Sequence, residues 1–396
     1  MKEISKIVNT LIQGNCVTIL KDIPDNSVNT IYLDPPFCTQ KEHRSMNHER
    51  NVLYSFNDKF KSLEEYLDML RLCLTECKRV LQADGSLFLH CDKTASHYLR
   101  QLLDEIFGKD NFINEIIWAY KRWSNSKKGL QNTHQVIFYY GKTSEYKFNT
   151  IYTDYSPTTN IDQILQERVK DEYGKSVYKK DEDGNIVKAK KKEGVPLSDV
   201  WEIPFLNPKA KERTGYPTQK PVALLKRILE ISTSEGDIVL DPFCGSGTTC
   251  VAAKSMNRKY IGIDISEDAI SLAEKRLEDM IISDSQLMKK GKEAYIEKGQ
   301  EDLTILKSLN AVTVQRNSLI DGYIKDSLIP ITIQKENDTI DTINQRINQI
   351  YFKYNPNSLI FILKYNIKDM NIIPEKWKSL LIIKTLSAQL YTDNYQ

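Results

Sequence analysis

Short apolar runs alternate with amphipathic helical patterns in the first 120 residues, and this alternation constrains the fold more than any other feature of the chain. Apolar side chains at intervals of three and four residues predict helices, and short runs of β-branched and aromatic residues predict strands. The predicted order is strand 28–33, helix 63–80, strand 86–90, helix 95–107 and strand 113–119. Strands that alternate with helices in this way are typical of a parallel α/β sheet covered by helices.

The regular pattern breaks down after residue 120 and resumes at Pro221. The chain then predicts helix 222–231, strand 237–240, helix 248–256, strand 260–264 and helix 269–282. A stretch rich in Lys and Glu follows, and the short strands and single helix expected beyond it are enough for a small α/β domain. We therefore divide the chain into four segments: 1–122, 123–205, 206–288 and 303–396.

The composition is that of an ordinary globular protein. Hydrophobic residues make up 40% and charged residues 27%, which excludes disorder or a fibre as the main class. The 55 Lys and Arg nearly balance the 53 Asp and Glu, so a basic tail that coats nucleic acid is excluded, although a local basic face is not. Neither a signal peptide nor a long apolar run is visible, and the seven cysteines are scattered. We therefore expect a reduced, soluble, cytoplasmic protein that makes no membrane contact.

A glycine-containing loop, Asp-Pro-Phe-Cys-Gly-Ser-Gly-Thr at residues 241–248, lies between a predicted strand and a predicted helix. Its glycines let the backbone approach a ligand, and the helix that follows begins with unpaired N–H groups. Asp264, 19 residues after Gly245, ends the next strand, where a carboxylate can accept hydrogen bonds from both ribose hydroxyls. The loop lacks the ending of a triphosphate-binding loop and the third glycine of a dinucleotide-binding loop, although a dinucleotide fold stays open. The pattern favours a nucleoside cofactor over a plain turn.

A second motif, Asp34-Pro35-Pro36-Phe37, follows the first predicted strand. An exocyclic amine on a nucleic-acid base is a poor nucleophile, because its lone pair is delocalised into the ring. Two acceptors, the Asp34 carboxylate and the Pro35 carbonyl, would take both N–H bonds and leave a lone pair that points outward. Phe37 offers a face for an extruded base, and the prolines stiffen the loop. This chemistry needs no metal and no covalent intermediate.

Together the motifs resemble the amino-group DNA methyltransferases that use S-adenosylmethionine (SAM), in the permuted (beta) arrangement. In that family the Asp-Pro-Pro-Phe/Tyr motif precedes the cofactor loop, and here Asp34 lies 207 residues before Asp241. Segments 84–92, 114–118 and 214–221 are also similar to the family, so the resemblance covers residues 10–280. It implies a class I, Rossmann-like mixed sheet flanked by helices, an inserted target-recognition region and a small C-terminal α/β domain.

The resemblance implies roles for individual residues. The residues that bind and stack the base would be Asp34, Pro35, Pro36 and Phe37. The SAM site would be formed by Asp241, Phe243, Gly245, Gly247, Thr248 and Asp264, with Thr218 and Lys220 near the methionine carboxylate. Carbon-5 cytosine methylation uses a Pro-Cys pair that is absent here, so we interpret Cys38 and Cys244 as packing residues. His90 and Asp92 face the expected pocket, and both a turn role and a catalytic role stay open for them.

In this family the segment between the two halves of the core contains the target-recognition region. The basic residues expected to bind DNA there, with one aromatic, are Lys121, Arg122, Trp123, Lys127, Lys128, Lys190 and Lys191. Phosphate contacts position an enzyme on DNA, and contacts to base edges select the sequence. A solvated loop surface remains the alternative explanation of these charges.

We therefore expect a site-specific DNA methyltransferase that flips a base from duplex DNA and methylates the exocyclic N6 of adenine. Adenine is favoured because Asp opens the tetrapeptide, whereas cytosine-N4 enzymes of this arrangement more often carry Ser. Cytosine-N4 methylation, an RNA-directed methyltransferase and a non-catalytic SAM- or DNA-binding protein are the alternatives. A restriction–modification system is the commonest setting, and an orphan regulatory methylase is the alternative. A cognate restriction endonuclease and a homodimer stay open as partners.

Overall fold

In the computed structural model the described residues are 3–46, 53–120, 129–153, 166–187, 194–207, 210–283, 298–315, 317–364 and 381–385. The chain divides into two compact units, Met1–Met288 and Lys289–Gln396. Each unit has hydrophobic clusters of its own. None of the helices in these ranges is long and apolar enough to cross a bilayer.

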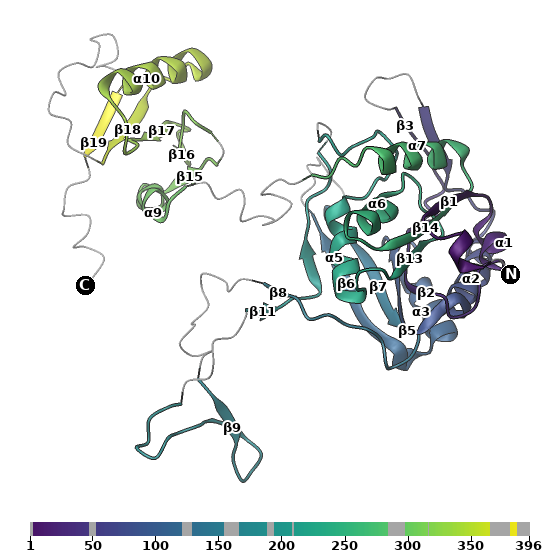
Figure 1. Cartoon of the computed structure of the whole chain (residues 1–396). Coiled ribbons are helices and arrows are strands. Elements are labelled where there is room, and N and C mark those ends of the chain that lie inside the picture. The colour runs from purple at the N-terminus through teal and green to yellow at the C-terminus, as the bar shows by residue number, and fades with distance from the viewer. Residues whose placement is uncertain are drawn as a thin grey trace. The chain divides into compact units, whose positions relative to one another are not determined.

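The first unit is built on an eight-stranded mixed sheet with the strand order β1-β14-β13-β2-β5-β7-β6-β12 (Figure 1). Neighbouring strands are parallel, except that β7 runs antiparallel to both β5 and β6. The strands are β1 Thr10–Gln13, β14 Lys259–Asp264, β13 Ile238–Asp241, β2 Val28–Leu33, β5 Leu81–Cys91, β7 His134–Gly141, β6 Phe112–Ala119 and β12 Val200–Glu202.

Helices cover both faces of this sheet (Figure 1). One layer consists of α1 Cys16–Leu20, α2 Leu63–Val80 and α3 Ser96–Phe107, and the other of α5 Val222–Ser232, α6 Thr248–Ser255 and α7 Glu267–Glu278. The first unit also contains two short 3-10 helices, Ile4–Lys6 and Lys109–Asn111. Apolar side chains at helical spacing, such as Leu70, Leu74 and Cys77 in α2, are fully buried against the sheet. The predicted α/β class, a mixed sheet flanked by helices, is confirmed.

The strand order of the sheet reverses between β13 and β2. These strands pair in parallel, with Val239 opposite Thr30 and Leu240 opposite Ile31. From β13 the chain crosses through α6 to β14 on one side, whereas from β2 it crosses through α2 to β5 on the other. The two loops that leave the carboxyl ends of β13 and β2 therefore diverge, and such a point is where open α/β sheets bind their ligands.

The structure extends the strand predicted at 86–90 toward the N-terminus, so that β5 begins at Leu81. The pairing of β5 with β2 slips so that Leu81 faces Val28 while Ser86 faces Thr30. A Cβ at Gly85 would lie 2.7 Å from Leu81 Cγ and 2.9 Å from the Asn29 carbonyl oxygen, so the glycine is needed for this close approach. Strand β7 was not predicted, and it inserts between β5 and β6.

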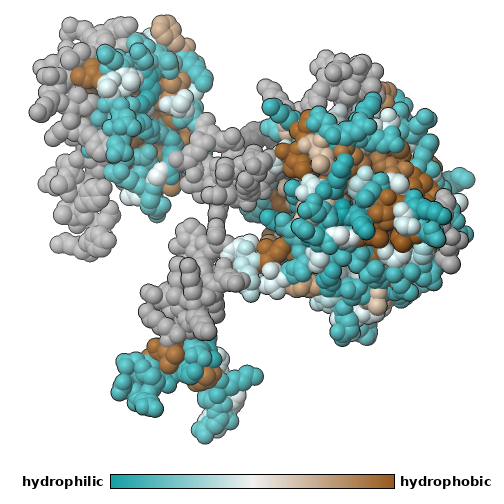
Figure 2. Space-filling model, in the orientation of Figure 1, coloured by the Kyte–Doolittle hydropathy of each residue, from teal (hydrophilic) through white to brown (hydrophobic). Residues whose placement is uncertain are grey.

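The region between β7 and β12 contains two small sheets. In one, β8 Tyr152–Thr153 pairs with β11 Val195–Pro196, and in the other β9 Arg168–Lys170 pairs with β10 Ser176–Tyr178. No side chain of residues 166–187 is buried, and the surface of this segment is mainly hydrophilic with apolar spots (Figure 2). A two-stranded hairpin without a buried core is at most marginally stable in water.

The second unit contains a five-stranded sheet in the order β15-β16-β17-β18-β19, in which only the last two pairs are parallel. Its elements are α9 Gln300–Ser308, β15 Ala311–Thr313, β16 Gly322–Ile324, β17 Pro330–Ile333, α10 Ile340–Tyr354, β18 Leu359–Leu363 and β19 Leu381–Thr385. The sequence predicted an α/β domain here but missed α9 and β16. The first helix begins before residue 303, where we expected the domain to begin.

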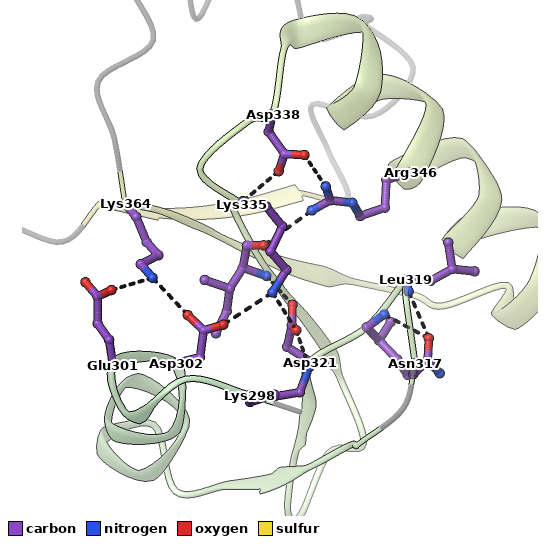
Figure 3. Close-up of polar contacts among 12 residues, drawn as sticks. Lys298, Glu301, Asp302, Asn317, Leu319, Asp321, Lys335, Asp338, Arg346 and Lys364 are labelled. Carbon is purple, nitrogen blue, oxygen red and sulfur yellow. Dashed lines mark hydrogen bonds and ion pairs between the residues drawn. The ribbon is translucent and has the colours of Figure 1, made fainter. Parts of the chain in front are cut away.

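Ion pairs between acidic and basic side chains connect α9 to the strand ends of the second unit (Figure 3). Asp321, which precedes β16, is 3% exposed and its Oδ1 contacts the ammonium groups of Lys298 and, at 3.0 Å, Lys335. Asp302 in the first turn of α9 accepts from Lys335 at 3.3 Å and from Lys364 at 3.0 Å. Burial works to raise the pKa of Asp302, but the hydrogen bond and charge of Lys364 and the charge of Lys335 hold it below its usual value.

This cluster predicts an acid-sensitive second unit. A carboxyl group whose pKa is lower in the folded chain stabilises the fold above its unfolded pKa, and that contribution is lost as the pH falls through the folded pKa. Asp302→Asn should therefore lower the stability of the unit by about 2 kcal/mol at neutral pH and by much less in acid. Hydrogen exchange of the α9 and β18 amides in the full chain measures this. Equal losses of protection at neutral and acid pH would contradict it.

Candidate active site

Two loops meet where the strand order reverses, between β13 and β2. One follows β2 and contains Asp34-Pro35-Pro36-Phe37, and the other follows β13 and leads into α6. Since Leu240 pairs with Ile31, the carboxyl ends of the two strands lie at the same edge of the sheet. The sequence pattern predicted that both motifs end strands, and the strand order shows why residues 207 positions apart form one site.

The Asp34 carboxylate is the first group of this site. Its Oδ2 contacts the ammonium group of Lys220, and only 6% of the Lys220 side chain and 17% of the Asp34 side chain are exposed. Asp34 Oδ1 is buried and has no hydrogen-bond partner among the described residues. Burial raises the pKa of Asp34, and the charge and hydrogen bond of Lys220 oppose this rise. One oxygen of the carboxylate is thus engaged, while the other is an unused acceptor.

His90, in β5, forms the wall beside Asp34. It is fully buried, its Nδ1 is 2.7 Å from the Tyr32 hydroxyl, and its Nε2 is 3.0 Å from Gln135 Oε1. Burial and the nearby charge of Lys220 lower the pKa of His90 far below its usual value, so the ring is neutral. With Gln135 Oε1 as an acceptor, Nε2 carries the proton and Nδ1 accepts from Tyr32. His90 therefore donates nothing to Asp34, although Nδ1 is 4.0 Å from Oδ1.

Phe37 presents a half-buried ring above these groups. Its centroid is 6.0 Å from that of His90, and Lys220 Nζ lies 5.3 Å from it. The polar acceptor of Asp34 and a flat aromatic surface therefore lie within one site, as the predicted pairing of amine binding and base stacking requires.

Asp58, which no local sequence pattern singles out, holds the backbone that follows Phe37. This residue is 1% exposed, and its carboxylate accepts from the backbone N–H of Cys38 at 2.8 Å and of Thr39 at 3.0 Å, from the Thr39 hydroxyl, and lies 3.6 Å from His43. Cys38 has a left-handed backbone, with a φ of 59°, which is costly for a residue with a Cβ. Asp58 thus stabilises a strained turn behind the stacking ring.

The second loop is held by two carboxylates. Asp264, at the end of β14, accepts from the Gly245 N–H at 2.8 Å and from the Ser266 N–H at 2.9 Å. Asp241 accepts from the Phe243 N–H at 3.0 Å and from the Thr249 hydroxyl at 2.5 Å. Gly247 has a φ of 74°, and a Cβ there would lie 2.6 Å from Ala273 Cβ in α7. The glycine is therefore required for the close packing of the loop on α7.

The pKa of Asp241 is also raised by its surroundings. Burial raises its pKa to about 7, the hydrogen bonds from Thr249 and Phe243 oppose this, and the charges of Asp34 and Asp264 raise it further. Three carboxylates thus line this edge of the sheet. Thr248, the first residue of α6, is buried, and its hydroxyl accepts from Arg276 at 3.0 Å.

The segment before α5 places Thr218 and Lys220. Gln219 is buried, accepts from the Thr214 N–H and donates to the Glu212 carbonyl oxygen, each at 2.8 Å. Thr218 has a left-handed φ of 61°, and Tyr216 lies under the loop, where a Cβ on Gly245 would be 3.1 Å from its ring. The sequence does not predict the contact of Lys220 with Asp34, and the place of Lys220 near the methionine carboxylate stays a prediction.

The residues predicted to bind DNA, Lys121, Arg122, Trp123, Lys127, Lys128, Lys190 and Lys191, lie outside the described residues. The structure describes the strands that lie next to both of these basic segments in the sequence. β6 ends at Ala119, directly before the first, and β11 begins at Val195, shortly after the second. Their role therefore stays a prediction from the sequence.

Comparisons with known proteins give the site a family context. A family model described as DNA methylase matches residues 28–275, and one described as D12 class N6 adenine-specific DNA methyltransferase matches residues 222–371. The chain is 32% identical to the Type II methyltransferase M.HpaI of Haemophilus parainfluenzae, over 68% of this chain and 74% of that protein. It is 30% identical to M.HinfI of Haemophilus influenzae over 71% of each chain. It is 31% identical to the DNA adenine methyltransferase YhdJ of Escherichia coli (strain K12), over 68% and 82%.

The Asp58 contacts predict a variant with an intact cofactor side and a damaged catalytic loop. Asp58→Ala removes the acceptor for two backbone N–H groups and releases the turn at Cys38, so Phe37 loses its fixed position. Because a displacement of about 1 Å at a reacting group can cost about 10²-fold in rate, we expect kcat to fall by about 10²-fold with SAM affinity unchanged. Steady-state methyl transfer and calorimetry measure the two quantities. A normal kcat would show that the turn holds without Asp58.

Proposed function

The chain belongs to the DNA methylase family, and we propose that within it the protein is a site-specific enzyme that methylates the exocyclic N6 of adenine in duplex DNA. The D12 class N6 adenine-specific model, which matches 222–371, and the name of the relative YhdJ support adenine as the target. The Asp that opens the tetrapeptide 34–37 supports it as well. A cytosine-N4 amine could use the same acceptors, and it remains the second candidate.

The observation that carries the proposal is the free oxygen of Asp34. A buried acceptor without a partner costs free energy, and an N–H donor from a substrate would satisfy it. If the Pro35 carbonyl takes the second N–H, the nitrogen becomes pyramidal and its lone pair points away from both acceptors. The half-buried ring of Phe37 provides the stacking surface that an extruded base needs.

The cofactor proposed for the second loop is S-adenosylmethionine. The loop fits a nucleoside, because each oxygen of Asp264 retains a lone pair beside its backbone bond and because Gly245 and Gly247 allow the left-handed backbone of the turn that leads into α6. We assign Asp241, Phe243, Gly245, Gly247, Thr248 and Asp264 to this site, with Thr218 and Lys220 at its edge. SAM supplies an electrophilic methyl group on a sulfonium sulfur. Catalysis by the protein then consists mainly of positioning the amine.

The relatives M.HpaI and M.HinfI carry the printed name Type II methyltransferase, which supports a restriction–modification setting for this chain. A cognate restriction endonuclease is the partner that such a setting supplies, and a homodimer is the assembly proposed for the enzyme itself. Since the substrate is chromosomal DNA, we place the enzyme in the cytoplasm. We assign the segment 123–205 to target recognition and the second unit to an accessory role.

Asp34→Ala tests the catalytic assignment. The variant removes the acceptor that fixes the amine, so we expect methyl transfer to fall by about 10²- to 10³-fold or more while SAM binding stays intact. Transfer of tritiated methyl groups to unmethylated duplex DNA measures the first quantity and calorimetry the second. Asp68→Ala, the same change at an exposed position of α2, is the matched control. Near-normal turnover by Asp34→Ala would overturn the assignment.

The basic segment makes a separate prediction. If Lys121, Lys127 and Lys128 contact DNA phosphates, replacing all three by Ala should weaken binding to every sequence alike and flatten the dependence of log K on log salt by about 2 to 3 units. Replacing the exposed Lys21 and Lys109 is the control. An unchanged salt slope would remove this segment from the DNA interface.

A further inference from the structure

Lys220 joins the two halves of the site in a way that neither motif explains. It belongs to the segment that leads into α5, on the cofactor side, yet its ammonium group contacts Asp34 Oδ2, 186 residues earlier in the chain. The side chain is almost completely buried. Burying a cation is costly unless it is paired, so this contact with Asp34 accounts for the position of Lys220.

We propose that Lys220 is a positioning residue for methyl transfer: its ammonium group keeps the Asp34 carboxylate charged, holds it by Oδ2 and leaves Oδ1 for the amine of the base. This inference rests on the proposed function, because it concerns the same reaction. It gives Lys220 a role toward the base, in contrast to the role toward the cofactor carboxylate that the family resemblance implies.

The charged form of Asp34 matters because of what the neutral form would do. A protonated carboxyl group carries an O–H donor, and that donor would bind the lone pair of the amine, which must instead attack the methyl group. In the reaction the amine nitrogen forms a bond to the methyl carbon, the bond from that carbon to sulfur breaks and its electrons stay on sulfur. The nitrogen then releases one proton to water. A charged Asp34 is an acceptor for the N–H bonds throughout.

Burial and the charge of Asp58 oppose the charged form of Asp34, and the geometry leaves Lys220 as the group that supports it. The titratable neighbours are Tyr32 on β2, Asp58 after strand β4 (Leu53–Asn57), His90 and Cys91 on β5, Tyr216 before α5 and Asp241 on β13. His90 is neutral and hydrogen-bonded elsewhere, and Asp58 and Asp241 are acids. Among the described residues that face Asp34, Lys220 supplies the positive charge.

The orientation follows from the same contact. A carboxylate held at one oxygen by a buried ammonium group cannot rotate freely about its Cβ–Cγ bond. The scaffold that fixes Lys220 is itself rigid, since Gln219 is anchored to both Thr214 and Glu212, and the Glu212 carboxylate accepts from the first N–H of α5 at 2.8 Å. The Phe37 ring centroid lies 5.3 Å from the same ammonium group. The contact with Lys220 therefore limits the directions in which the free Oδ1 can receive an N–H.

Lys220→Met tests this role, with Lys220→Arg as the conservative variant and Lys226→Met, six residues later on α5, as the matched control. Single-turnover methyl transfer to unmethylated duplex DNA is followed across the acid and neutral range, and the affinity for S-adenosylhomocysteine is measured by calorimetry. Lys220→Met should lower the rate at neutral pH by about 10²-fold and move the acid limb of the pH–rate profile about 1 to 3 units higher, because Asp34 then needs a higher pH to ionise.

The two roles of Lys220 give opposite results in this experiment. A positioning role predicts that the affinity for S-adenosylhomocysteine changes by less than about threefold and that Lys220→Arg recovers most of the neutral-pH rate. A loss of affinity of more than about tenfold with an unmoved acid limb would overturn the proposal in favour of the cofactor carboxylate. A wild-type protein that transfers no methyl group to DNA would instead overturn the proposed function.

A second variant keeps the test valid if Lys220→Met alone does not fold, since that change leaves a buried carboxylate unpaired. The double variant Lys220→Met/Asp34→Asn removes both charges. If it folds and binds S-adenosylhomocysteine as the wild type does, Lys220 serves Asp34. If the double variant folds but has lost this affinity, Lys220 serves the cofactor and the proposal is wrong.

Discussion

The parallel pairing of β13 with β2 is the constraint on which the rest of the site depends. It brings together two loops that are more than 200 residues apart and makes their connections leave in opposite directions. Neither loop could form a site alone, because one carries the acceptor and the stacking ring and the other carries the glycine cradle. Every interaction between the halves, including the contact of Lys220 with Asp34, follows from this register.

Burial then determines the chemistry of the side chains at this edge of the sheet. It raises the pKa of Asp34 and Asp241, lowers that of His90 and makes an unpaired oxygen costly. The hydrogen bonds of Tyr32 and Gln135 with His90 complete a neutral wall, so the charge of Asp34 depends on Lys220. A site of this kind is organised before the substrate arrives, and the protein contributes acceptor placement and a stacking surface.

Much of this arrangement could be predicted from local patterns. Helix α2 and strand β2 have the predicted ends, because the apolar periodicity of the one and the prolines after the other are signals within a few residues. The motifs at Asp34 and Asp241 were recognised for the same reason. Strand β7, helix α9 and the Asp58 contacts were missed, since each depends on partners distant in sequence: β7 lies between two strands, α9 is held by Lys335 and Lys364, and Asp58 acts on a turn 20 residues earlier. The contact between Lys220 and Asp34 required the register of the sheet.

Nucleoside mass spectrometry of unmethylated bacterial DNA, after incubation with the wild-type protein and SAM, tests the central claim most directly. Our account predicts that N6-methyladenine appears and that the Asp34→Ala protein produces none. N4-methylcytosine in its place would keep the amine chemistry and contradict the adenine assignment. If SAM binds but no methylated base forms in DNA, while RNA incubated in the same way is methylated, the account of a DNA methyltransferase is contradicted.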